Sequence, residues 1–282
     1  DMKVRPAWNL ARGAGVVVAV ADTGIELSHP DLSSRVASNP SEIAGDGIDN
    51  DNNGYIDDTS GWDFVDSDKT PAAPDNGHGT HVAGIISAEQ NNGQGISGVA
   101  PAARILPLRV LGADGSGAWS QIAEAFDYAG KMNIPIVNAS LGGYGSVATI
   151  DSVIASHPNT LYVFAAGNDG VSLDNYTFYP CESPESNELC VGATDPANNV
   201  ASFSNYSPTA VDIAAPGEDI ASTYTGAGYV WLSGTSMATP NVSAVAALVA
   251  GASSRRGAVL KDTLTTTADM SLSGWVASGH IN

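Results

Sequence analysis

Short apolar runs alternate with segments of helical spacing along most of this chain. The run at 15–21, GVVVAVA, is typical of a buried strand because of its length and its valine content. Further strands are predicted at 105–110, 134–138, 161–165, 191–194 and 211–214, and helices at 80–88, 120–132, 147–156, 236–251 and 256–266. This order predicts an α/β fold of three layers, in which helices cover both faces of a mainly parallel central sheet.

Parallel sheets of this kind bind ligands at the carboxyl ends of their strands. We therefore expect chemistry just after Ala21, Asn138 and Ala165. The helix predicted at 236–251 is apolar nearly all round, which indicates that it is buried. Pro240 falls in about its first turn, where a missing N–H is tolerated.

Length and composition favour one folded domain spanning 1–282. The chain has no internal repeat or linker, and its 43% hydrophobic residues exclude disorder of the whole chain. No apolar run approaches the roughly 18 residues of a membrane span. An Asp-rich segment at about 45–75 lacks an apolar period, and we expect an ordered inserted loop there. The N-terminus carries no charged-then-apolar leader, so we expect any signal peptide to have been removed.

The charge balance of the chain is strongly acidic. There are 11 basic and 30 acidic residues, which gives a net charge of −19. A nucleic-acid binder needs a basic footprint, so we expect no nucleic-acid partner, and for the same reason no anionic membrane. An acidic surface attracts cations and favours calcium sites, although it also serves plain solubility in salty or cold surroundings.

Two cysteines bracket a polar loop. Cys181 and Cys190 flank eight residues rich in Glu, Ser, Pro and Asn. This arrangement predicts one local disulfide, formed in an oxidising compartment outside the cell. The alternative is a pair of buried thiols in a cytosolic protein.

Three polar motifs follow predicted strands or open predicted helices: Asp22-Thr23-Gly24, the segment 76–81 (NGHGTH) and the segment 234–240 (GTSMATP). A serine at a glycine-flanked helix start is a plausible nucleophile, and it needs a histidine base that a buried carboxylate orients. Asp22, His78 and Ser236 supply these groups, and His81 is an equally placed alternative base. Taken singly, the Asp and the Ser are ordinary caps and the His is structural.

These motifs resemble the three signatures of the subtilisin-like serine peptidases, the subtilases, in the forms VADTG, NGHGTHVAG and SGTSMATP. The segments 111–117 (LGADGSG), 138–143 (NASLGG) and 165–168 (AAGN) resemble the substrate-strand, S1-wall and oxyanion-hole blocks of that family. The match runs from about Pro6 to the end of the chain in the family's order. The order Asp, His, Ser, together with Ala238 in place of a final Gly, excludes the α/β-hydrolase elbow.

The resemblance implies a role for each residue of the motifs. Ser236 is the expected nucleophile that forms an acyl-enzyme, His78 the base and Asp22 the group that orients it. The resemblance selects His78 over His81, which is then a packed structural histidine. The side-chain amide of Asn168 and the N–H of Ser236 are expected to stabilise the oxyanion.

The resemblance also implies how an extended polypeptide would bind. Gly115, Ser116 and Gly117 are expected to pair with the substrate as an added strand. Trp119 is expected to close the P4 pocket, unless it is an ordinary core residue. Small walls leave room for a large apolar P1 side chain, and Asp169 at the rim could admit Lys or Arg. The two opposite S1 walls are expected to be Ser140, Leu141 and Gly142 on one side and Ala165, Ala166 and Gly167 on the other.

A calcium site is predicted in the Asp-rich segment. Residues 49–54, DNDNNG, fit the start of a D-x-[DN]-x-[DN]-G calcium loop. The expected ligands are Asp49, Asp51, Asn53, the Tyr55 carbonyl, and Asp57 or Asp58. A carboxylate at 57 or 58 is needed because Ser60 stands where the loop normally has its Glu. The alternative is a turn rich in Asp and Asn without metal.

Two further calcium sites rest on the resemblance. The segment 61–70 is similar to the medium-strength calcium site of thermitase-like subtilases, with Asp63, Asp66, Asp68 and the Thr70 carbonyl as ligands; its alternative is a solvated acidic loop. Asp31, Asn92 and the carbonyls of Gln94 and Ile96 match the family's high-affinity calcium loop, although this loop is one residue longer and the N-terminal arm is short. Two or three structural Ca²⁺ ions are therefore expected.

Together these features predict a secreted, monomeric, calcium-stabilised serine endopeptidase of broad specificity with an apolar P1 residue. The resemblance implies extended polypeptide substrates and a propeptide that acts as folding aid and inhibitor; we expect the propeptide and any C-terminal extension to lie outside this chain. A selective processing subtilase and an inactive subtilase used as a binding module are the alternatives. The resemblance also implies a cis bond between Tyr179 and Pro180.

Overall fold

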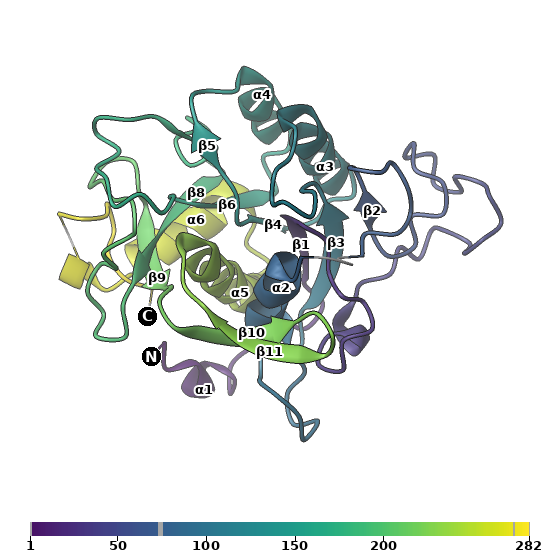
Figure 1. Ribbon diagram of the computed structural model, residues 1–282, viewed down its shortest axis with the longest axis horizontal. Coiled ribbons are helices and arrows are strands. Elements are labelled where there is room, and N and C mark those ends of the chain that lie inside the picture. The colour runs from purple at the N-terminus through teal and green to yellow at the C-terminus, as the bar shows by residue number, and fades with distance from the viewer. Residues whose placement is uncertain (1, 73–75, 273, 282) are drawn as a thin grey trace.

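A seven-stranded parallel sheet forms the centre of the computed structural model, which describes residues 2–72, 76–272 and 274–281 (Figure 1). Its strand order is β2-β3-β1-β4-β6-β8-β9, and every neighbouring pair is parallel. The strands are β1 Val17–Asp22, β2 Trp62–Asp63, β3 Arg104–Arg109, β4 Ile136–Ala139, β6 Leu161–Ala165, β8 Glu188–Thr194 and β9 Ile213–Pro216.

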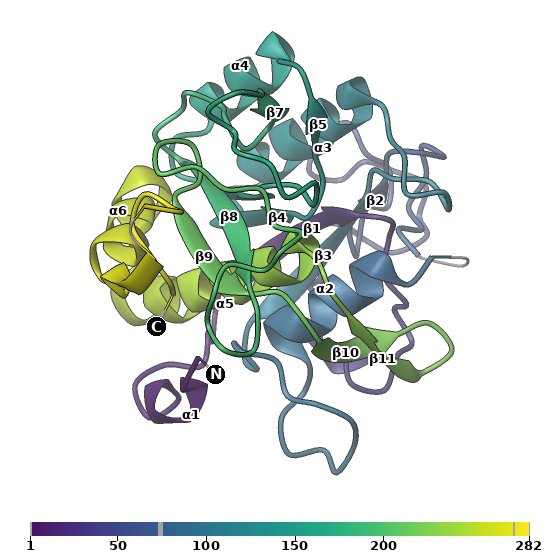
Figure 2. The ribbon, with the colours of Figure 1, turned by 60° about the vertical axis from the view of Figure 1, so that its left-hand side comes forward.

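Helices cover both faces of this sheet, which confirms the predicted fold class (Figure 2). Side chains of β1 alternate between the two cores. Val18 and Val20 pack toward the face with α2, α5 and α6, whereas Ala19 and Ala21 pack toward the face with α3 and α4. The run is apolar throughout because both faces are buried. The helices are α2 His78–Ser87, α3 Trp119–Lys131, α4 Ala148–Ser156, α5 Thr235–Ser253 and α6 Gly257–Thr266.

Several short elements are absent from the sequence-based prediction. Two antiparallel pairs lie outside the main sheet, one joining β5 to β7 and one joining β10 to β11. Their partners are set by packing on the rest of the fold, and a short strand carries little periodicity of its own. The elements are α1 Val4–Ala7, η1 Ser33–Arg35, β5 Gly143–Tyr144, β7 Phe178–Tyr179, β10 Ile220–Tyr224, β11 Gly228–Leu232 and η2 Met270–Leu272.

The Asp-rich segment 45–75 is an irregular loop that contributes β2, the edge strand of the sheet (Figure 1), and its end at 73–75 lies outside the described residues. Tyr55 packs edge-to-face on Trp62, Phe64 and Tyr128, and the hydroxyl of Tyr128 donates to the buried Asp58. These contacts anchor a polar loop on α3, which explains its order without an apolar period.

Helix α5 departs from the prediction at Pro240. The helix begins at Thr235, so Pro240 is its sixth residue and lies beyond the first turn. A proline there leaves the carbonyl of Ser236 without its helical donor. The hydroxyl of Ser140 donates to that carbonyl oxygen instead, at 2.9 Å.

A disulfide joins Cys181 and Cys190, as the sequence predicts, with their Cα atoms 4.8 Å apart. The bond between Tyr179 and Pro180 is cis, as the resemblance implied. Among the described residues, no helix has both the length and the apolar character to cross a membrane.

Candidate active site

Asp22 and His78 meet where β1 ends and α2 begins. Asp22 is the last residue of β1 and is fully buried, and the side chain of Asn76 accepts the first N–H of α2 from His78 at 3.0 Å. Gly79 lets the helix approach the strand, because a Cβ there would overlap the carbonyl oxygen of Gly24. The result is a 2.7 Å hydrogen bond between Nδ1 of His78 and Oδ1 of Asp22.

The environment of this pair favours the charged imidazolium. Burial opposes protonation of His78, but the charge of Asp22 and its hydrogen bond outweigh burial and raise the pKa of His78. The backbone N–H of Thr23 also donates to Oδ1 of Asp22, at 2.7 Å. Because 29% of the His78 side chain is exposed, its second nitrogen remains accessible to a substrate.

His81, the alternative base, has a different environment. Its Nε2 lies 3.1 Å from the carbonyl oxygen of Ile220 and 3.3 Å from that of Val230, so this nitrogen carries the proton. The residue is fully buried, and burial is the main cause that lowers the pKa of His81 to about 4. A neutral histidine that is bonded to β10 and β11 has a structural role, and the geometry favours His78 as the base.

Ser236 is the second residue of α5 and is half-buried. Its hydroxyl donates to the carbonyl oxygen of Ser140 at 3.2 Å, and among the described residues no hydrogen bond joins it to His78. Such bonds are often long before a substrate binds. The side chain of Asn138 donates to the hydroxyl of Ser140 at 3.1 Å, which fixes the serine that holds Ser236.

The side chain of Asn168 is held against the start of α5. The carboxamide oxygen of Asn168 accepts from the N–H and the hydroxyl of Thr235, at 2.8 and 3.0 Å. Its NH₂ group therefore points away from Thr235. A Cβ built on Gly234 would lie 3.6 Å from both this nitrogen and the N–H nitrogen of Ser236, so the two groups lie near each other beside Gly234. The sequence reasoning missed Thr235, although its place directly before Ser236 was a signal.

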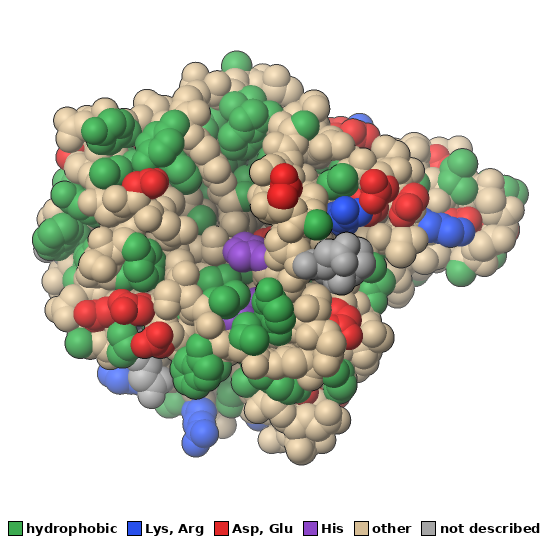
Figure 3. Space-filling model, in the orientation of Figure 1, with side chains coloured by type: hydrophobic (Ala, Val, Ile, Leu, Met, Phe, Trp, Pro, Cys, Tyr) green, Lys and Arg blue, Asp and Glu red, His purple; other side chains and the backbone are tan. Residues whose placement is uncertain are grey.

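A cleft of about 510 Å³ runs beside His78. Figure 3 shows histidine side chains at the hollow in the middle of this face. The cleft includes most of the predicted substrate-binding residues: Gly115, Ser116, Gly117, Trp119, Ser140, Leu141 and Gly142. Ala165, Ala166 and Gly167, the predicted second S1 wall, are all buried and do not line it.

Phe178 lies between the two predicted S1 walls, and the sequence reasoning missed it. A Cβ on Gly142 would overlap Cε1 of Phe178, and a Cβ on Gly167 would lie 3.0 Å from its Cζ. No motif marks this residue, because its place depends on the pairing of β7 with β5.

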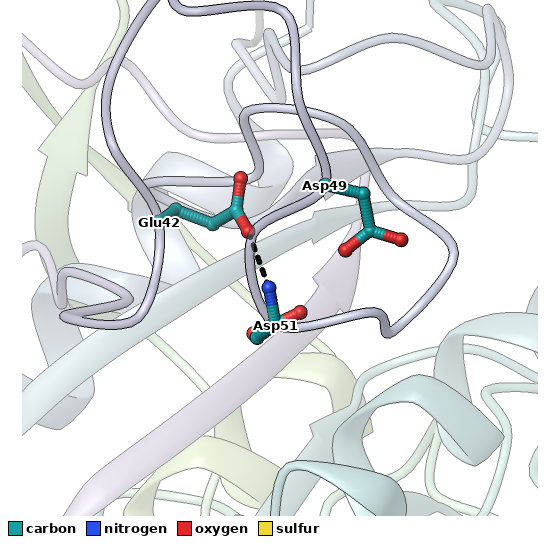
Figure 4. Close-up of side chains that lie close together, drawn as sticks. All are labelled: Glu42, Asp49 and Asp51. Atoms are coloured by element: carbon teal, nitrogen blue, oxygen red, sulfur yellow. Dashed lines mark hydrogen bonds between the residues drawn. The ribbon is translucent and has the colours of Figure 1, made fainter.

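Three acidic side chains converge in the Asp-rich segment. One carboxylate oxygen from each of Glu42, Asp49 and Asp51 lies within 4.8 Å of the others (Figure 4). Carboxylate oxygens are the donors that calcium prefers, so this set fits the ion. Glu42 precedes the predicted loop and was missed; it accepts the N–H groups of Asn50 and Asp51 at 2.8 and 3.2 Å.

The side chains of two other predicted ligands of that loop have partners of their own. Asp57 forms a 2.7 Å ion pair with Lys69, and the hydrogen bond from Lys69 is the main cause that lowers the pKa of Asp57. Asn53 donates its side-chain amide to Asp58 at 2.8 Å, and its carboxamide oxygen accepts from the N–H of Tyr55 at 2.8 Å. The structure therefore does not bring Asp57 into the acidic cluster, because a lysine pairs with it.

Arg109 stands in the second predicted calcium site. It forms ion pairs with both Asp63 and Asp66. Asp68 accepts the N–H of Thr70 at 2.7 Å. The guanidinium already supplies positive charge to the two carboxylates, so the expected ligand set does not fit an ion in this arrangement.

The third predicted site is a hydrogen-bonded cluster around the buried Asp31. The carboxylate accepts from the side-chain amide of Asn92 at 2.6 Å, the N–H of Ile96 at 3.1 Å and the hydroxyl of Tyr229 at 2.9 Å. Asn92 also accepts the N–H of Gln94 at 3.0 Å. Three hydrogen-bond donors face the Asp31 carboxylate, so this arrangement does not fit a cation. No motif in the sequence marks Tyr229.

Comparison with known proteins agrees with this geometry. Residues 13–279 match the subtilase family. Thermitase of Thermoactinomyces vulgaris is 40% identical over 281 residues, which cover 98% of this chain and 90% of that protein. Subtilisin BL of Lederbergia lenta is 43% identical over 240 residues, which cover 84% of this chain and 77% of that protein. The crystal structure of a cold adapted subtilisin-like serine proteinase matches with a TM-score of 0.75 at 32% identity, over 96% of this chain and 88% of that one. The chain therefore belongs to the subtilase family and is a serine protease.

Proposed function

We propose that this chain is a secreted, calcium-stabilised serine endopeptidase that cleaves extended polypeptides after apolar residues. The observation that carries the proposal is the 2.7 Å bond between His78 and the buried Asp22, together with the place of Ser236 in the first turn of α5. We further propose that 1–282 acts as one monomeric catalytic domain, and that its own propeptide assists folding and inhibits it.

The proposed mechanism assigns one task to each group. The hydroxyl of Ser236 attacks the scissile carbonyl, and His78 accepts its proton and then gives it to the leaving amine. Asp22 keeps the imidazole oriented and stabilises its charged form. The NH₂ group of Asn168 and the N–H of Ser236 bind the oxyanion. The acyl-enzyme is then hydrolysed by water in the same way.

The cleft supports binding of an extended chain. Gly115, Ser116 and Gly117 line it near His78, and Trp119 lies at the start of α3 in the same lining. An extended peptide can add to an exposed backbone edge by main-chain hydrogen bonds. The substrate would thus lie along 115–117 with its scissile bond at Ser236.

Calcium would act on stability rather than on chemistry. The acidic cluster of Glu42, Asp49 and Asp51 supports one site in the inserted loop. An ion that binds only the folded protein stabilises it by mass action, more as its concentration exceeds Kd. Without the ion, these carboxylates repel one another.

The test is hydrolysis of a peptide library in calcium and in EDTA, with and without phenylmethylsulfonyl fluoride. We expect hydrolysis that the inhibitor abolishes, with one adduct located on Ser236 by mass spectrometry, and faster inactivation in EDTA. Ser236→Ala is the matched inactive control. Cleavage of a few sites only would indicate a selective processing enzyme. A folded, calcium-loaded protein that neither hydrolyses nor is labelled would indicate a binding module and overturn the proposal.

A further inference from the structure

Phe178 is held against the first predicted S1 wall. It belongs to β7, which pairs antiparallel with β5 so that Phe178 lies opposite Tyr144 and Tyr179 opposite Gly143. Since β5 directly follows Ser140–Gly142, this pairing fixes Phe178 against that wall. The residue is 8% exposed, so its ring is packed rather than free in solvent.

The ring of Phe178 contacts both walls. A Cβ built on Gly142 would point at the Phe178 ring, overlap its Cε1 and lie 2.8 Å from its Cζ. A Cβ on Gly167 would first meet Nδ2 of Asn205, at 2.4 Å, and the Phe178 ring is its next neighbour, with Cζ at 3.0 Å and Cε2 at 3.1 Å. One aromatic ring therefore takes up space between the two segments that would have to enclose a P1 side chain.

A hydrogen bond ties the two walls together at their outer ends. Tyr144 follows the first wall in the sequence, and Asp169 follows the second. The hydroxyl of Tyr144 donates to Oδ2 of Asp169 at 2.7 Å. The ring of Tyr144 packs edge-to-face on Phe178, with centroids 5.3 Å apart. The bond also occupies the carboxylate that could have received a P1 lysine or arginine.

From this geometry we infer that Phe178 fills the inner part of the S1 subsite and restricts P1 to small side chains such as alanine. The inference rests on the proposed function, because it assumes that substrate binds between these walls. The predicted large apolar P1 residue requires the room that Phe178 occupies. A hydrophobic pocket discriminates about 10- to 200-fold per methylene that it gains or lacks, so several missing methylenes set a strong preference.

The experiment compares peptide p-nitroanilides that differ only at P1, with alanine, leucine or phenylalanine. Active sites are counted by titration with a serine-directed inhibitor, so that kcat/KM refers to folded enzyme. We expect the native enzyme to prefer alanine over phenylalanine by at least roughly 10-fold. Phe178→Leu and then Phe178→Gly are expected to raise the phenylalanine-to-alanine ratio in steps, by roughly 10- to 100-fold in all.

The control is Leu10→Ala, which removes an apolar side chain that is 87% exposed and lies outside both walls and the segment of Phe178. Its P1 preference is expected to stay that of the native enzyme. The inference is overturned if the native enzyme cleaves after phenylalanine as well as after alanine, a result that needs no variant to fold. It is also overturned if Phe178 variants that the inhibitor labels keep the phenylalanine-to-alanine ratio of the native enzyme. Failure of the inhibitor to label the folded native protein would instead overturn the proposed function, and the inference with it.

Discussion

Ser140 and Ser236 exchange hydrogen bonds across the active site. The hydroxyl of Ser140 donates to the carbonyl oxygen of Ser236 at 2.9 Å, and the hydroxyl of Ser236 donates to the carbonyl oxygen of Ser140 at 3.2 Å. The first bond exists because Pro240 cannot donate to that carbonyl. The proline that interrupts α5 thus makes the position of the proposed nucleophile depend on a loop after β4.

Ser140→Ala should weaken both the fold and catalysis. It leaves the Ser236 carbonyl without a protein donor, which costs about 1 kcal/mol of unfolding free energy, and it loosens the backbone of Ser236. We expect a lower kcat with little change in KM, measured on titrated enzyme, and a lower midpoint in urea. Ser152→Ala removes an exposed hydroxyl that bonds within α4 and serves as the control. A native kcat in folded Ser140→Ala would contradict this role.

Asn168→Ala should lower kcat by roughly 10²–10³-fold, the magnitude known from subtilisin itself for loss of one oxyanion donor. KM should change little, because the donor acts mainly in the transition state. Thr235→Val is the informative companion, since it keeps the N–H that holds Asn168 and removes only the hydroxyl. We expect a smaller loss of kcat for it. A raised KM with an unchanged kcat for Asn168→Ala would point to a role in substrate binding instead.

The proposed calcium site can be tested without hydrolysis in the Ser236→Ala background, which prevents autolysis. Glu42→Gln and Asp49→Asn should each reduce the rise in Tm that calcium produces, because each removes one charged oxygen ligand. Saturating the native site at about 100 times Kd would add roughly 2.7 kcal/mol of unfolding free energy. Asp262→Asn, on the exposed face of α6, should respond to calcium as the parent does. Identical Tm values in calcium and in EDTA for the parent would exclude a stabilising ion.

The sequence predicted those features whose signal is local. The valine run of β1 marks a strand buried on both faces, and the glycine-flanked Ser236 and the Asn76–His78 turn mark helix starts that carry polar groups. These patterns are sufficient for the layers of the fold. They also placed Asp22 at the carboxyl end of a strand, where ligands bind, but they left His78 and His81 open as its partner, and only the resemblance to the subtilases selected His78.

The features that the sequence did not predict depend on contacts between distant segments. Phe178 reaches Gly142 only because β7 pairs with β5, and Arg109 reaches Asp63 only because β3 pairs with β2. An acidic motif in the sequence does not reveal that a guanidinium stands beside it in the fold. The acidic residue Glu42 joins Asp49 and Asp51 by loop geometry, without a motif of its own.

The pH dependence of kcat/KM should report His78. Activity requires its neutral form, so we expect an acid limb whose apparent pKa lies above the ordinary 6.5, as Asp22 raises the pKa of His78. Asp22→Asn should move the acid limb to lower pH and reduce kcat by about 10⁴-fold.

The free energy of unfolding should depend on pH in the opposite direction to activity. The charged His78–Asp22 pair contributes fully below pH 6.5, and its contribution is lost as pH rises through the folded-state pKa. Urea unfolding of Ser236→Ala with and without Asp22→Asn between pH 5 and 9 measures that loss, and parallel curves would refute it.

His81 should make the folded protein less stable in acid, whereas the His78–Asp22 pair stabilises it most at low pH. Burial lowers the pKa of His81 to about 4 from 6.5, so below pH 6.5 the unfolded chain binds a proton that the folded protein refuses until about pH 4. Stability therefore falls as pH drops through this window. The fall should be less steep when His81→Gln is added to Ser236→Ala, because that side chain does not titrate. The substitution also removes packing on β10 and β11, where Nε2 of His81 bonds the carbonyls of Ile220 and Val230. We therefore compare the slopes of unfolding free energy against pH, because lost packing changes the absolute values and titration changes the slopes. Equal slopes in the two proteins between pH 4 and 6.5 would show that His81 is not the acid-sensitive group.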